Sequence, residues 1–85
     1  MLIDVRTPEE YAEAHLVGAI NIELSADMTS KLPAEARRQS LELYCRSGGR
    51  ARAAEEILSQ AGYRVDNLGG IDDALTLGYS LAVAH

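Results

Sequence analysis

Short runs with strand character alternate along this chain with segments that carry helix signals, and this alternation constrains the fold more than any other feature. The runs of strand-forming residues are 2–5, 19–24, 41–44 and 63–68. The segments with helix signals are 7–16, 50–61 and 71–78. Strands joined by helical crossovers lie parallel in one sheet. The sequence therefore predicts an α/β fold with a mostly parallel sheet.

The first helix has a complete start signal. Thr7 is placed to act as the N-cap, Pro8 suits the first helical position, and Glu10 completes a capping box with Thr7. The polar segment 25–40 is expected to be irregular or to form short helices, with Pro33 as a second start signal.

Length and composition narrow the class of protein. A chain of 85 residues is expected to form a single domain over 1–85. A net charge of −5 argues against a nucleic-acid partner, and no apolar run is long enough for a membrane span. One cysteine excludes an internal disulfide and a multi-cysteine metal site. No metal or cofactor is expected. Because Met1 leads directly into a strand, we expect a cytoplasmic protein, or a periplasmic one if a signal peptide has been removed.

That one cysteine stands in an unusual setting. It follows the run 41–44 and directly precedes the helical segment 50–61, so it lies where parallel sheets bind ligands, at the carboxyl end of a strand. Three of the eight basic residues follow it within seven positions. The candidate site is the stretch Cys45, Arg46, Ser47, Gly48, Gly49 and Arg50.

The chemistry of such a turn favours an anion. A glycine-containing turn that opens a helix directs several backbone N–H groups into one concavity, where the helix dipole adds positive charge. Helix N-termini and neighbouring cations favour the thiolate form of a cysteine, so neither His15 nor His85 is needed as a base. A lone cysteine is more often a small buried hydrophobe, but two glycines and three arginines favour a nucleophile. Arg46 and Arg50 are expected to bind an anionic substrate.

Two long stretches resemble one known family. "LIDVRTPEEYAEAHLVGAINI" and "YCRSGGRARAAEEILSQAGYRVDNLGG" are similar to the rhodanese-like domains, and above all to the small single-domain thiosulfate sulfurtransferases among them. The resemblance implies a small rhodanese-like domain with a mostly parallel central sheet of about four strands and helices on both faces. It also implies that Cys45 takes the sulfane sulfur of thiosulfate or another donor as a persulfide, cradled by the backbone of Cys45 to Arg50.

The resemblance further implies an acceptor, which is cyanide or a thiol, either a small thiol or a thioredoxin-like protein. A monomer or a weak dimer is expected. Asp4 and Arg6, at the end of the first strand run, are expected to support the loop through a salt bridge or hydrogen bonds. His15 is expected to make a structural contact. Three glutamates of the first helix are expected to form a solvated face: Glu9, Glu10 and Glu13.

Two other functions remain open. A phosphatase or arsenate reductase on the same scaffold needs five residues between cysteine and arginine, whereas four separate Cys45 from Arg50 and Ala51 occupies the position such an enzyme would need. A non-catalytic interaction module is the other alternative, although such rhodanese-like domains usually lose the cysteine that this chain retains.

Overall fold

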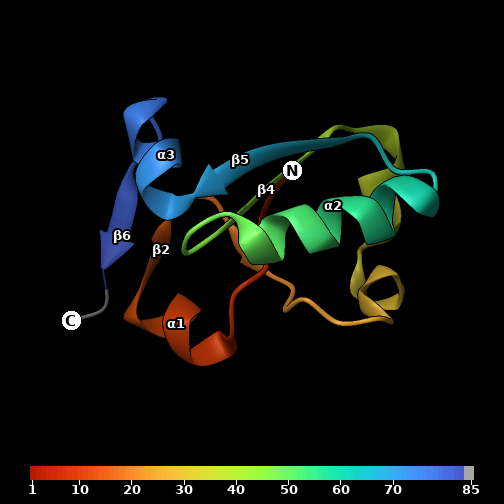
Figure 1. The fold of residues 1–85 in the computed structure, drawn as a ribbon, viewed down its shortest axis with the longest axis horizontal. Helices are drawn as coiled ribbons and strands as arrows, with labels where there is room; N and C mark the ends of the chain where they lie inside the picture. The colour runs from red at the N-terminus through yellow and green to blue at the C-terminus, as the bar shows by residue number, and fades with distance from the viewer. Residues whose placement is uncertain (84–85) are drawn as a thin grey trace.

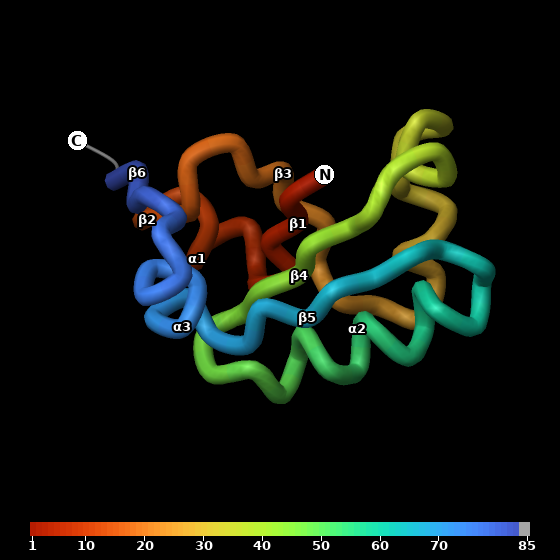
Figure 2. The backbone as a smooth tube through the Cα atoms, turned by 90° about the horizontal axis from the view of Figure 1, so that it is seen from above, coloured from red at the N-terminus to blue at the C-terminus, as the bar shows by residue number. Residues whose placement is uncertain are grey.

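A parallel sheet of four strands with helices on both faces makes up the centre of the computed structural model, which describes residues 1–83 (Figure 1). Its strands are β1 (Leu2–Asp4), β3 (Ile20–Asn21), β4 (Leu41–Cys45) and β5 (Val65–Gly70). They lie in the order β3-β1-β4-β5, and every neighbouring pair is parallel (Figure 2). The α/β fold class predicted from the alternating segments is confirmed.

The helices divide between the two faces of this sheet. They are α1 (Pro8–Glu13), the 3-10 helices η1 (Met28–Lys31) and η2 (Ala34–Arg38), α2 (Gly49–Gln60) and α3 (Ile71–Thr76). Residues of α2, η1 and η2 share one buried cluster with the sheet, and residues of α1 and α3 contribute to a second. The short helices around Pro33 confirm the expectation for 25–40.

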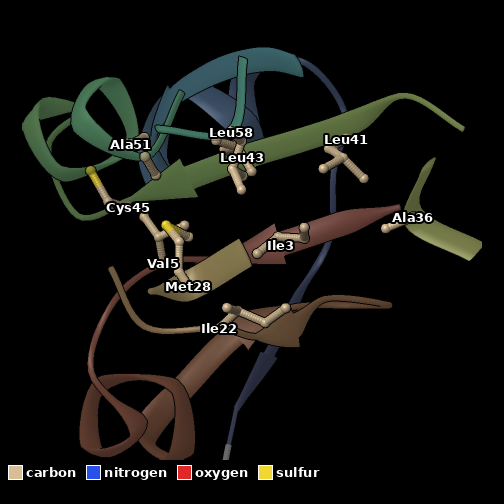
Figure 3. Packing of buried hydrophobic residues seen from close by; sticks show 11 residues of the cluster. Ile3, Val5, Ile22, Met28, Ala36, Leu41, Leu43, Cys45, Ala51 and Leu58 are labelled. Carbon is tan, nitrogen blue, oxygen red and sulfur yellow. The ribbon is translucent and has the colours of Figure 1, made fainter. Parts of the chain in front are cut away.

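Strand β4 lies in the interior of the sheet and contacts both clusters. Because side chains alternate along a strand, Leu43 and Cys45 face α2 while Tyr44 faces the cluster of α1 and α3. Figure 3 shows Leu43 and Cys45 within the first cluster, beside Leu58 and Ala51 of α2. The alternation therefore places Cys45 on the α2 side of the sheet.

The predicted start of α1 is confirmed in detail. The Thr7 hydroxyl accepts a hydrogen bond from the Glu10 backbone N–H at 3.2 Å, and the Glu10 carboxylate accepts one from the Thr7 N–H at 3.1 Å. Pro8 occupies the first turn, as expected.

Several predicted boundaries are wrong. The first helix ends at Glu13, because Ala14–Leu16 forms strand β2, which pairs antiparallel with β6 (Leu81–Val83), a strand the sequence did not predict. Tertiary pairing here overrides a helical pattern in the sequence. The strand predicted over 19–24 shortens to β3, and the Gly69-Gly70 pair, expected to be a turn, forms the end of β5.

No helix within residues 1–83 is both long enough and apolar enough to cross a bilayer. His85, for which the sequence predicted no role, lies outside the described residues.

Candidate active site

Cys45 is the last residue of β4 and only 1% of it is exposed. Its sulfur lies at the end of the buried cluster and points toward the loop that opens α2 (Figure 3). The backbone N–H of Gly48 donates a hydrogen bond to Sγ, with nitrogen and sulfur 2.9 Å apart. The strand end thus holds the thiol beneath the turn that the sequence predicted.

Gly48 is the residue that turns this loop. It precedes α2 with a φ of +104°, in the left-handed region where a side chain is strained, and its carbonyl accepts a hydrogen bond from the N–H of Arg52 at 3.0 Å. Gly49 then begins the helix. This conformation points the Gly48 N–H back at Cys45, where it favours negative charge on the sulfur.

The three arginines that follow Cys45 in the sequence lie in different environments. Arg46 and Arg52 are exposed, as is Ser47. Arg50 instead forms a bidentate ion pair with Glu10 of α1, with Nη1–Oε1 and Nη2–Oε2 distances of 2.6 and 3.0 Å. The expectation that Glu10 lies on a solvated face is therefore wrong, because Glu10 contacts the loop.

The ion pair and the capping box together determine the charge of Glu10. Hydrogen bonding to Arg50, followed by smaller contributions from Thr7, lowers the pKa of Glu10 from 4.5 to about 2. The same hydrogen bond raises the pKa of Arg50 above its already high value. Both groups are therefore ionised at neutral pH. Glu9 and Glu13 are exposed, as expected.

The junction of β5 and α3 also contacts the Cys45 loop, at Gly70. A Cβ atom at Gly70 would lie 2.6 Å from the Arg46 carbonyl oxygen and 3.2 Å from the Ser47 Cα. Only glycine fits at this position without moving one of the two backbones. The sequence shows a Gly-Gly pair there, but no local signal indicates that the Cys45 loop packs against it.

Asp4 and Arg6 form the expected salt bridge, which is buried. Arg6 Nη2 donates to Asp4 Oδ2 at 2.7 Å, and Arg6 Nη2 also donates to the Ala14 carbonyl at 2.6 Å. The hydrogen bond to Asp4 is the main reason that the pKa of Arg6 is raised. The pair ties the end of β1 to the start of β2.

Tyr44, next to Cys45, completes this network and was missed by sequence reasoning. Its hydroxyl donates to Asp4 Oδ2 at 2.7 Å and accepts from the Leu16 N–H at 2.9 Å. Burial raises the pKa of Tyr44, so the hydroxyl stays protonated. A tyrosine directly before the cysteine was the only available signal.

His15 makes the expected structural contact. Its ring stacks on Tyr11 with centroids 3.8 Å apart, and its Nδ1 lies 2.8 Å from the Tyr11 carbonyl oxygen. Within residues 1–83, no three His, Cys, Asp or Glu side chains gather as a metal site would require.

Comparisons with known proteins agree with this arrangement. Thiosulfate sulfurtransferase PspE of Escherichia coli (strain K12) is 40% identical over 84% of this chain and 70% of its own length. A sulfurtransferase of Allochromatium vinosum is 37% identical over 82% of this chain and 65% of its own length. The solved structure of a rhodanese with anions from E. coli superposes with a TM-score of 0.78, at 34% identity, over 98% of this chain and 96% of that one.

The similarity to PspE confirms the resemblance to small thiosulfate sulfurtransferases. The family model of the rhodanese-like domain matches residues 1–74, which include β1, the Cys45 loop and Gly70. This chain belongs to the rhodanese-like domain family.

Proposed function

We propose that this chain is a sulfurtransferase that moves the sulfane sulfur of thiosulfate to cyanide or a thiol through a persulfide on Cys45. The observation that carries the proposal is the Cys45 sulfur at the end of β4, 2.9 Å from the Gly48 nitrogen and beneath the first turn of α2. The similarity to PspE, named a thiosulfate sulfurtransferase, supports thiosulfate as the donor.

In the first half-reaction, the Cys45 thiolate attacks the outer sulfur of thiosulfate. A new sulfur–sulfur bond forms on Cys45 as the sulfur–sulfur bond of thiosulfate breaks, and sulfite leaves with the electron pair. The terminal sulfur of the resulting persulfide is negatively charged. The Gly48 N–H and the amino end of α2 stabilise that charge as they stabilise the thiolate.

In the second half-reaction, an acceptor removes this sulfur. Cyanide attacks the terminal sulfur, the persulfide bond breaks, thiocyanate forms, and the Cys45 thiolate is regenerated. A thiolate acceptor reacts in the same way and becomes a persulfide itself. Because the intermediate is covalent, the two half-reactions are separate and ping-pong kinetics are expected.

The other loop residues favour the binding of the donor, by contact or by charge. Gly48 and Gly49 allow its close approach to the backbone, Ser47 offers a hydroxyl donor, and Arg46 and Arg50 supply positive charge for a dianion. Asp4 and Arg6 act at a distance, because Asp4 of this salt bridge accepts a hydrogen bond from Tyr44, the residue before Cys45.

The exposure of this loop supports the proposed cellular partners. Arg46 and Ser47 are exposed, which supports access for a small thiol or for a thioredoxin-like protein. We expect a monomer or a weak dimer, since the proposed chemistry uses residues of one chain. The cytoplasmic location stays a prediction from the sequence.

Intact-mass measurement after thiosulfate treatment tests the function directly. The protein should gain the mass of one sulfur atom and lose it on addition of cyanide, with release of thiocyanate. Cys45→Ser should neither gain this mass nor form thiocyanate, while its thermal unfolding curve stays close to that of the parent protein. A folded parent protein that forms no persulfide would favour the interaction-module alternative. Hydrolysis of an aryl phosphate through Cys45 would favour the phosphatase alternative.

A further inference from the structure

The contact between Glu10 and Arg50 joins two elements that are far apart in sequence. Glu10 lies in the first turn of α1, and Arg50 lies 40 residues later, at the end of the Cys45 loop. Both carboxylate oxygens of Glu10 accept from Arg50, one from each terminal nitrogen. Such a fork-to-fork pair fixes the plane and the direction of a guanidinium group.

Glu10 is itself held in place. Its Oε1 accepts from the Thr7 N–H at 3.1 Å and from the Thr7 hydroxyl at 3.2 Å, besides its bond to Arg50. The side chains of Glu10 and Arg50 are 25% and 35% exposed, so solvent reaches the pair without separating it. The capping box of α1 therefore fixes the acceptor to which Arg50 binds.

This pairing separates Arg50 from the other two arginines of the site. Each terminal nitrogen of Arg50 donates one of its two N–H groups to Glu10, so the terminal fork of the guanidinium is engaged while three other N–H groups remain. The side chains of Arg46 and Arg52 are exposed, and neither forms a hydrogen bond with any other part of residues 1–83. No such pair holds Arg46 or Arg52 in place within residues 1–83, whereas Arg50 can offer its terminal fork to an anion only by leaving Glu10.

We propose that Glu10 is a positioning residue of the sulfur-transfer site, which holds Arg50 beside the Cys45 loop as a fixed charge and keeps its terminal fork from binding the oxygens of an anion. This inference rests on the proposed function, since it says which cations contact the donor. Glu10 thereby weakens the binding of oxyanions that are not donors, such as sulfate. It also favours release of the sulfite product.

Glu10→Gln is the informative change, because glutamine can keep the capping box while it removes the charge that holds Arg50. Freed from Glu10, Arg50 should join the oxygens of a bound anion. We expect both the KM for thiosulfate and the inhibition constant for sulfate to fall roughly three- to tenfold, the range of one partly exposed charged contact. The rate of cyanide attack on preformed persulfide should change less, because cyanide lacks those oxygens.

The matched control is Glu9→Gln. Glu9 lies on the same helix, is exposed and forms no ion pair with another residue of 1–83, and its substitution changes the net charge by the same amount. It should leave both constants within about twofold of the parent values, since an unpaired surface charge acts only weakly through solvent. A second control is Glu10→Gln in an Arg50→Met background, where the gain in anion binding should be lost because no guanidinium is released.

A second readout needs no turnover. Sulfate should slow the alkylation of Cys45 by iodoacetamide, and half-protection should require three- to tenfold less sulfate in Glu10→Gln than in the parent protein. If the parent protein forms no persulfide, the proposed function fails, and this protection still decides the role of Glu10.

Three results would overturn the proposal. The first is an equal change in Glu9→Gln, which would indicate a general effect of net charge. The second is an equal change in the Arg50→Met background, which would mean that Glu10 does not act through Arg50. The third is sulfate protection that is absent from every variant or the same in parent and Glu10→Gln, which would mean that Arg50 adds nothing to anion binding when released.

Discussion

Gly70 offers the sharpest test of how the Cys45 loop is held. A methyl group at this position would place its carbon 2.6 Å from the Arg46 carbonyl oxygen, 3.2 Å from the Ser47 Cα and 3.3 Å from the Arg46 carbonyl carbon. The φ of Gly70 is −83°, which alanine adopts without strain. The effect of Gly70→Ala is therefore purely steric, and it acts on the backbone of the loop rather than on a side chain that could turn away.

The size of the effect follows from these distances. The closest contact falls about 0.8 Å short of the 3.4 Å at which ordinary packing begins, so the loop must move away from β5. Overpacking of this kind destabilises a protein by about 1–3 kcal/mol. A displacement near 1 Å at a reacting centre can slow a reaction about a hundredfold. We expect persulfide formation to slow roughly ten- to a hundredfold.

Urea unfolding and single-turnover kinetics with thiosulfate measure the two effects separately. Gly49→Ala is the control for stability, because a Cβ there meets nothing within 4 Å and alanine favours a helix more than glycine does. It should be as stable as the parent protein or more so. A Gly70→Ala variant with parent stability and parent kinetics would refute the argument that β5 supports the loop.

Three further predictions concern charged groups. Arg46→Ala should slow persulfide formation by about tenfold, because a charge-assisted hydrogen bond to the donor is lost. It should slow the transfer of sulfur to cyanide less. Equal slowing of both steps in single-turnover kinetics would indicate a distorted loop instead. Arg6→Met should reduce the free energy of unfolding by about 3–5 kcal/mol, because it leaves the buried Asp4 carboxylate without its cation. Urea unfolding measures this loss, and a value below about 1 kcal/mol would contradict the prediction. The pKa of Glu10 in the folded state lies below its unfolded value. Its contribution to the free energy of unfolding is therefore complete above pH 4.5 and is lost as the pH falls toward about 2. For a pair this exposed we expect about 1 kcal/mol, measured as the difference in acid unfolding between the parent protein and Glu10→Gln; identical acid transitions would contradict it.

Residues close together in the sequence were sufficient to predict the position of Cys45, the proposed nucleophile. The run 41–44, the glycines and the helix formers of 50–61 are contiguous, and a strand followed by a tight turn and a helix is a local arrangement. Parallel strands follow from the same alternation, because helical crossovers return the chain in the same direction. The capping box at Thr7 and the salt bridge of Asp4 with Arg6 are also local, since their partners lie within three residues.

What surrounds the proposed nucleophile was decided only by tertiary packing. Glu10 has the sequence signature of an ordinary capping glutamate, and nothing near it indicates that its carboxylate binds Arg50. Gly70 and Tyr44 likewise act on segments distant in the chain, the first on Arg46 and the second on Asp4. Strand β2 follows a helical pattern in the sequence, yet it is a strand because β6 supplies its partner. Local patterns are set by the backbone preferences and periodicity of neighbouring residues, whereas these contacts depend on how the helices and the sheet pack together.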